Sequence, residues 1–137
     1  MTIIDMQTMR YINLLDRASH VKTSKCFLYN NSIIFAVPKL FLGKAIGPDA
    51  INVRKIQEEL GKRVRVIAEP NGAEDIQHFI ESIVAPVKFK SLAVENGLAT
   101  LNAGSQSKAA LIGRNRRRYD ELARIVKNTF NVELKIV

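Results

Sequence analysis

The chain lacks the residues and runs that mark several protein classes. Cys26 is its single cysteine in 137 residues, which excludes an internal disulfide and cannot by itself form a structural zinc site. No apolar run approaches the roughly 20 residues that a membrane-spanning helix requires. Asp5 and Arg10 interrupt the N-terminus, where a signal peptide would have its apolar region. We therefore expect a soluble cytoplasmic protein with no membrane span and no metal.

Motifs of catalysis are also missing. The sequence contains neither G-x-S-x-G nor H-E-x-x-H, and His20 and His78 are far apart in the chain. The segment 104–109, Gly-Ser-Gln-Ser-Lys-Ala, is faintly similar to a phosphate-binding loop, but it lacks the glycine before the lysine and the Ser or Thr after it. We expect no enzyme activity and no cofactor.

What the chain has in excess is positive charge. Lys and Arg number 21 against 13 Asp and Glu, which gives a net charge of +8, and each half of the chain is net basic. Such a balance predicts a polyanionic partner, with nucleic acid first and an anionic membrane surface as the alternative. Hydrophobic residues make up 47% and charged residues 25%, a composition typical of globular proteins.

Apolar periodicity and turn residues predict six elements in the first half. In order, we expect a helix over 8–18, strands over 26–30 and 32–37, a short helix over 40–46, a helix over 53–60 and a strand over 64–67. Asn30-Asn31 suits the turn between the strands, because asparagine tolerates positive φ. Gly47 ends the short helix, and Gly61 caps the next one.

Pro70-Asn71-Gly72 breaks the chain, after which the same order begins again. We expect helices over 76–84 and 119–130, a short helix ending at Gly113, and strands over 87–95, 98–101 and 132–137. In the first of these strands, Lys88 and Lys90 would share one face. Asn96-Gly97 is a strong hairpin signal. The two halves therefore form an internal repeat.

The repeat carries a short motif at matching places. Ile46-Gly47-Pro48-Asp49-Ala50 and Ile112-Gly113-Arg114-Asn115-Arg116 are both similar to I-G-x-x-G, the loop between two helices of RNA-binding KH domains. The chain thus resembles two tandem type II KH domains, residues 1–70 and 71–137, and the short archaeal form of the NusA transcription factors. The resemblance implies an α+β fold with a three-stranded sheet covered by helices in each domain. It also implies single-stranded RNA as partner and a role in transcription termination or antitermination.

The resemblance assigns RNA contact to the two loops and to basic residues beside them. In the KH family the loop backbone clamps about four nucleotides by their phosphates. The candidate residues are Lys44, Gly47, Pro48, Asp49, Ala50, Arg54 and Lys55 in the first half, and Gly113, Arg114, Asn115, Arg116, Arg117 and Arg118 in the second. We expect the second loop to be the stronger anion site, since four arginines crowd its positions.

Both loops depart from the motif at its second glycine. Ala50 adds a single methyl group, which is tolerated if the residue is already helical. Arg116 either keeps the backbone away from the ligand or replaces a backbone contact with a side-chain contact. Asp49 would repel a phosphate unless it turns aside to cap the following helix.

Other interpretations compete with RNA binding. The arginine cluster can be a solvated helix start, and Lys44 can be merely solvated. Tyr29 and Phe35 could stack on bases, although core packing is the better explanation for both. A second functional hypothesis is a non-catalytic module that docks on RNA polymerase or a ribonucleoprotein with degenerate loops, and a third is binding to structured RNA such as ribosomal RNA. We expect a monomer.

Overall fold

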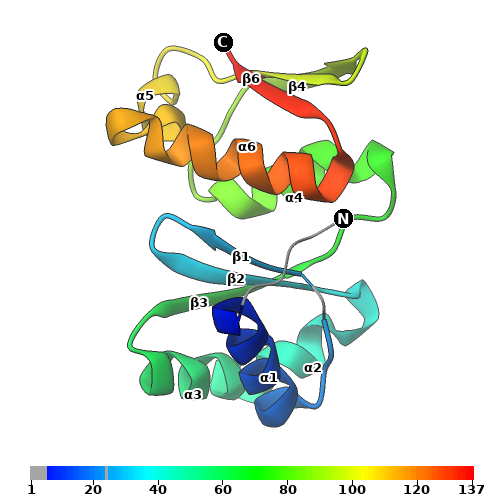
Figure 1. Cartoon of the computed structure of the whole chain (residues 1–137), viewed down its shortest axis with the longest axis vertical. Helices are drawn as coiled ribbons and strands as arrows, with labels where there is room; N and C mark the ends of the chain where they lie inside the picture. Colours follow the sequence, from blue (N-terminus) through cyan, green and yellow to red (C-terminus); the bar gives the residue numbers. More distant parts are fainter. Residues whose placement is uncertain (1–5, 24) are drawn as a thin grey trace. The chain divides into compact units, whose positions relative to one another are not determined.

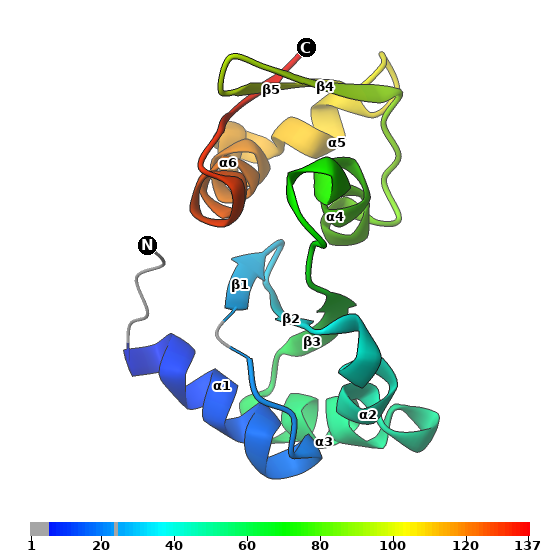
Figure 2. The same ribbon diagram turned by 90° about the vertical axis from the view of Figure 1, so that its right-hand side faces the viewer.

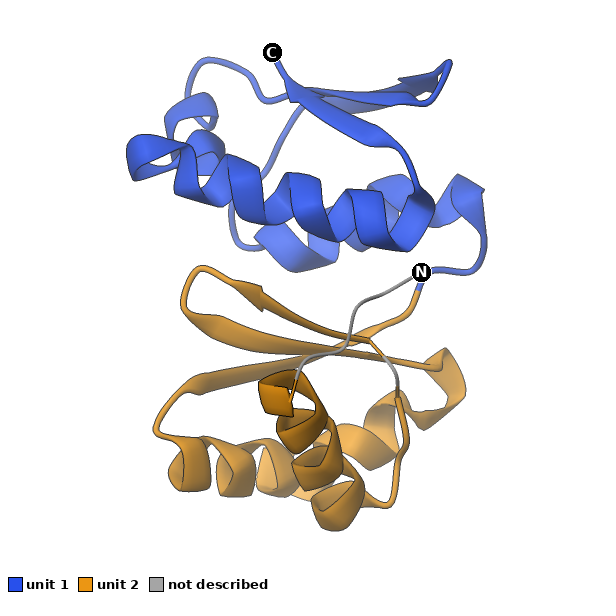
Figure 3. Ribbon diagram, viewed as in Figure 1, with its two compact units in different colours: residues 1–2, 70–137 blue, residues 3–69 orange. Residues whose placement is uncertain are grey.

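The computed structural model describes residues 6–23 and 25–137, which form two compact units (Figures 1 and 3). The N-terminal unit ends at Glu69, and the C-terminal unit runs from Pro70 to Val137. Each unit is a three-stranded sheet with its helices on one face (Figure 1). This is a mixed α+β architecture, and two such units in series fit a tandem KH-like arrangement.

The N-terminal unit follows the predicted order. Its elements are α1 (Met6–Ser19), β1 (Lys25–Tyr29), β2 (Ser32–Val37), a 3-10 turn (Lys39–Phe41), α2 (Leu42–Ile46), a second 3-10 turn (Pro48–Ala50), α3 (Ile51–Leu60) and β3 (Arg63–Ala68). β2 is the central strand, antiparallel to β1 and parallel to β3. Parallel pairing requires a crossover connection, and α2 and α3 provide it.

Local chemistry sets the turns of this unit, and apolar burial holds it together. Asn30 and Asn31 both have positive φ (51° and 60°), as the hairpin requires. Gly61 caps α3 in the left-handed conformation. The core lies between the helices and the inner face of the sheet, and it includes Leu15, Ile33, Phe35, Val37, Ala45, Ile56 and Val64.

The C-terminal unit repeats the topology. Its elements are a 3-10 turn (Ala73–Asp75), α4 (Ile76–Val84), β4 (Ser91–Glu95), β5 (Leu98–Asn102), α5 (Lys108–Ile112), a 3-10 turn (Arg114–Arg116), α6 (Arg117–Phe130) and β6 (Glu133–Ile136). β5 is antiparallel to β4 and parallel to β6. The predicted hairpin forms at Asn96-Gly97, where φ is 50° and 77°. Phe79 of α4 meets Phe130 of α6 edge to face, with ring centroids 5.6 Å apart.

The strand predicted over 87–95 is wrong in its first part. β4 begins only at Ser91; a turn lies at residues 85–86, and residues 87–90 are irregular. The Val87 N–H donates to Val84 O at 3.0 Å, so a turn after α4 uses the group that a strand would offer to its neighbour. Pairing with β5 starts at Lys90, whose N–H donates to Asn102 O at 2.8 Å. Lys88 and Lys90 therefore do not lie along one face of a strand.

Candidate nucleic-acid interface

The two predicted loops share one backbone conformation. Gly47 ends α2 with φ 80° and ψ 166°, and Gly113 ends α5 with φ 76° and ψ 170°. In each case the glycine N–H donates at 2.9 Å to the carbonyl four residues earlier, that of Gly43 or Ala109. The chain therefore leaves both short helices in the same way.

Two left-handed residues follow in each loop and lead into the next helix. They are Asp49 (φ 54°) and Ala50 (φ 57°) before α3, and Asn115 (φ 57°) and Arg116 (φ 60°) before α6. Ala50 is thus not in the right-handed helical conformation in which its methyl group would be tolerated. Glycine adopts the left-handed conformation more readily than other residues, because it has no Cβ, so the second glycine of the motif would fit the backbone at both positions.

Close packing explains the first glycine of each loop. A Cβ on Gly47 would lie 2.9 Å from Ile51 Cγ2, and one on Gly113 would lie 2.6 Å from Arg118 Cγ. Asn52 packs over Gly47 and donates from Nδ2 to the Lys44 carbonyl at 3.1 Å, which ties the start of α3 to the end of α2. Each loop is thus a tight junction between two helices.

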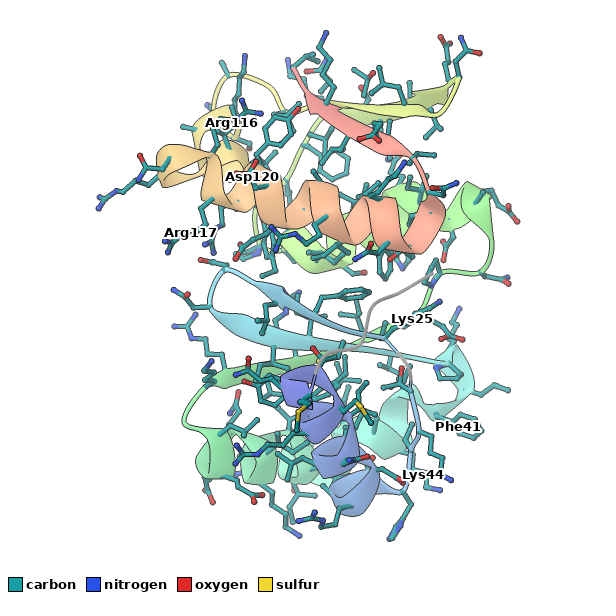
Figure 4. All side chains as sticks on the ribbon, viewed as in Figure 1. Lys25, Phe41, Lys44, Arg116, Arg117 and Asp120 are labelled. Carbon is teal, nitrogen blue, oxygen red and sulfur yellow. The ribbon has the colours of Figure 1, made fainter. Side chains whose placement is uncertain are left out.

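Arg116 stacks on the helix that it opens. Its guanidinium carbon lies over the ring of Tyr119, 4.7 Å from the centroid, and Figure 4 shows Arg116 at the start of α6. The Tyr119 hydroxyl donates to Leu134 O of β6 at 3.0 Å, which fixes the ring. The side chain at the second-glycine position therefore has a defined place on an anchored aromatic surface.

The other arginines of the second loop differ in their surroundings. Arg118 Nε pairs with Glu121 at 3.1 Å, and its side chain is only 12% exposed. Arg114 and Arg117 are exposed, and neither has an ion pair within the described residues. Figure 4 shows Arg117 projecting outward from α6. Arg114 and Arg117 are thus exposed cations that a phosphate can reach.

The first loop has fewer groups that could bind an anion than the second loop. Pro48 has no N–H, whereas Arg114 at the matching position has one. Asp49 does not cap α3: the helix starts after Ala50 with no side-chain cap, and the Asp49 carbonyl instead accepts a hydrogen bond from Arg54 Nη2. Arg54 therefore stabilises the loop through this hydrogen bond. Lys44 and Lys55 are exposed and remain candidates for contact with a ligand.

The chain is similar in sequence to archaeal proteins. No family model matches the chain. It is 23% identical over 128 residues to the "Probable transcription termination protein NusA" of Halococcus morrhuae, covering 91% of this chain and 90% of the relative. It is 24% identical over 131 residues to the protein of the same name from Methanocaldococcus jannaschii, covering 92% of this chain and 70% of that one.

A solved structure has the same fold. The crystal structure of APE1850 superposes with a TM-score of 0.67 at 24% identity, covering 98% of this chain and all of the other. Together the similarities support a relationship with archaeal NusA-like proteins of KH type. For the described residues, no helix is long and apolar enough to cross a membrane, and no group of three His, Cys, Asp or Glu residues could hold a metal ion.

Two apolar residues beside the first loop escaped the sequence interpretation. Leu40 is 92% exposed and Phe41 47% exposed, although both belong to an apolar run. Figure 4 shows Phe41 and Lys44 on the same side of the α2 region. The 3-10 turn after Pro38 puts them outside the core, and apolar periodicity alone does not show this. Tyr29 and Phe35 are buried, as core packing predicts.

Proposed function

We propose that the protein is a non-catalytic, cytoplasmic factor that binds single-stranded RNA during transcription, in termination or antitermination. On this proposal, residues 1–70 and 71–137 are two type II KH domains, and the second loop, Gly113–Arg116, is the main phosphate site. The order helix, strand, strand, helix, helix, strand in both units, with an antiparallel and then a parallel pairing, supports the domain assignment.

The observation that carries the proposal is the second loop itself. It combines a 3-10 turn that follows Gly113, the N-terminus of a 14-residue helix and the exposed cations Arg114 and Arg117. A helix start favours anions, because its first N–H groups lack intrahelical partners and the peptide dipoles add positive potential. Exposed guanidinium groups add bidentate phosphate contacts.

Arg116 has a separate role in this proposal. Its guanidinium carbon lies over the Tyr119 ring and the residue is exposed, so the guanidinium plane can also accept an unstacked base. RNA-binding proteins use arginine planes in this way, and stacking tolerates any base because each has a π-face. The arginine replaces the backbone approach of the usual glycine with a side-chain contact.

The transcription context comes from the relatives. Both are named as transcription termination proteins, and each aligns with more than nine tenths of this chain. RNA polymerase or a transcription complex is therefore a partner that we include in the proposal. The RNA-binding claim rests on the site and can be tested alone.

Fluorescence anisotropy with a labelled single-stranded RNA of about 12 nucleotides, a few times the four that one KH domain contacts, tests this claim at low salt. Arg114→Gln/Arg117→Gln should weaken binding strongly, since it removes charge-assisted hydrogen bonds to phosphate. The matched control is Arg10→Gln/Arg17→Gln, which removes two arginines from α1. An equal loss of RNA affinity in both variants would show that binding depends only on the net charge of the protein. No binding by the folded wild-type protein would refute RNA binding.

A specific observation favours docking as a second function for the N-terminal unit. Its loop has Asp49 and lacks the N–H at Pro48, while Leu40 and Phe41 next to it are exposed. Leu40 and Phe41 are consecutive in the chain, and contiguous exposed apolar patches mark protein interaction sites. Leu40→Ser/Phe41→Ser should abolish copurification with RNA polymerase from nuclease-treated extract, while Leu28→Ser, another exposed apolar residue, should not. Unchanged copurification would argue against docking through this patch.

A further inference from the structure

A cavity of about 370 Å³ lies in the C-terminal unit, at the end of α5 opposite the second loop. Two segments meet there, the residues before β4 and the connection from β5 to α5, and Figure 2 shows them beside each other. The cavity is lined by Lys88, Phe89 and Lys90 from the first segment and by residues 103–107 from the second. None of these residues belongs to the predicted RNA loops.

Backbone hydrogen bonds fix the walls of the cavity. Lys90 is tied to β5 through Asn102 O, and the Ala103 N–H donates to Val137 O at 3.1 Å. Gly104 has φ 80°, and a Cβ there would lie 3.1 Å from Lys90 Cε. A glycine therefore lets the aliphatic part of Lys90 cross the connection at close range. The two segments are held together without help from a ligand.

All charged residues that line the cavity are positive. Lys88 and Lys90 contribute two ammonium groups, and no lining residue is acidic. Within the described part of the chain, neither lysine makes an ion pair. Ser105, Gln106 and Ser107 add side-chain donors, and Phe89 adds one apolar wall. The residues that line this cavity thus include two cations, several neutral donors and an aromatic ring.

We propose that this cavity binds a nucleotide through its terminal phosphate, with Lys88 and Lys90 on the phosphate and Phe89 against the ribose or base. A phosphate monoester carries a charge of about −1.5 to −2 at pH 7, which matches two ammonium groups better than an internal phosphodiester does. The volume lies near the lower end of the roughly 300–1,000 Å³ typical of ligand pockets, which suits a single nucleotide.

The nucleotide has two possible sources, a free mononucleotide or the 5′-phosphate end of an RNA. Both present the same phosphate monoester, so the cavity chemistry is shared. The proposal does not require the second loop to bind RNA. For this reason its test uses the Arg114→Gln/Arg117→Gln variant as background, which lacks the two exposed loop arginines.

The test is an NMR titration of the ¹⁵N-labelled full chain, carrying Arg114→Gln/Arg117→Gln, with AMP. Amide shifts should change for residues 88–90 and 103–107, and adenosine, which lacks the phosphate, should leave them unchanged. Lys88→Gln/Lys90→Gln should weaken AMP binding at least about tenfold, because the variant cannot form the charge-assisted hydrogen bonds. Lys62→Gln/Lys135→Gln removes two exposed lysines elsewhere and should bind AMP like the background variant.

A pair of four-nucleotide RNAs, with and without a 5′-phosphate, then separates the sources. Tighter binding of the phosphorylated RNA than of both AMP and the unphosphorylated RNA identifies an RNA end, and tighter binding of AMP identifies a free nucleotide. The proposal is overturned if AMP changes only the amide shifts of residues outside the cavity, or if adenosine changes the cavity shifts as much as AMP does. It is overturned as well if inorganic phosphate changes the cavity shifts and AMP does not. It is also overturned if the Lys88→Gln/Lys90→Gln variant, shown to be folded by its unchanged remaining amide signals, binds AMP normally.

Discussion

The guanidinium of Arg116 lies 4.7 Å from the centroid of the Tyr119 ring, three residues further along the same chain. Tyr119 is itself anchored to β6 through its hydroxyl. Arginine at a left-handed position costs backbone energy, and the stack on an anchored ring offsets part of that cost. The departure from glycine at this position is therefore accompanied by a specific compensating contact.

Arg116→Gly should change stability little and weaken RNA binding. Glycine removes about 1 kcal/mol of left-handed strain, while removal of the cation–π interaction costs about 0.5–1 kcal/mol. Urea denaturation and RNA anisotropy measure the two effects. Tyr119→Phe keeps the ring and removes the bond to Leu134 O, so it should lower stability by about 1 kcal/mol and leave RNA affinity unchanged. A gain in affinity for Arg116→Gly would mean that the arginine blocks the backbone.

Ala50→Gly should stabilise the N-terminal unit. Ala50 has φ 57°, and glycine avoids the left-handed penalty of about 1 kcal/mol that a Cβ brings there. Ala18→Gly is the matched control, since Ala18 lies in α1, where glycine should destabilise by roughly 1 kcal/mol. In urea denaturation, the free energy of unfolding should rise for Ala50→Gly and fall for Ala18→Gly. The same sign for both would contradict the left-handed assignment of Ala50.

Gly47→Ala should destabilise the protein, whereas Gly43→Ala should not. Gly47 occupies a region of φ and ψ that is nearly exclusive to glycine, where another residue costs about 1–3 kcal/mol. A Cβ there also meets Asn52 and Ile51. Gly43 is helical with open space around it, so alanine should stabilise by roughly 0.5–1 kcal/mol. Thermal unfolding of the two variants compares these outcomes, and equal midpoints would count against the junction described here.

The arginines of the second loop should contribute unequally to RNA affinity. Arg118 is paired with Glu121 and largely covered, so Arg118→Gln should lower affinity less than Arg117→Gln, whose side chain is exposed. Arg118→Gln should instead lower stability, because it leaves Glu121 without this ion pair. Anisotropy and urea denaturation together give both readouts. A larger affinity loss for Arg118→Gln would place the phosphate on the covered side of the helix start.

Much of the fold could be predicted from local patterns. The apolar stripe of α4, the Asn96-Gly97 hairpin and the glycines that end α2 and α5 each act within a few residues, and the structure confirms them. The strand over 87–95 was too long, because its alternation of apolar and basic residues is also compatible with a turn. The turn is decided by the hydrogen bond from Val87 N–H to Val84 O.

The candidate site was predictable in position but not in conformation. The glycine motif located both loops, yet alanine gives no sign that Ala50 is left-handed, since that state is imposed by the junction between α2 and α3. The separate environments of Arg117 and Arg118 follow from the direction of each side chain on α6. Four arginines in five positions look equivalent in a sequence, and only the structure separates them.

The salt dependence of RNA binding tests the central claim most directly. If the second loop holds phosphates, log affinity should fall linearly with log salt, and Arg114→Gln/Arg117→Gln should reduce the slope by about 0.7 for each phosphate that the variant no longer neutralises. Arg10→Gln/Arg17→Gln should retain the wild-type slope. A wild-type slope in the Arg114→Gln/Arg117→Gln variant, with the protein folded, would contradict the assignment of this loop as the phosphate site.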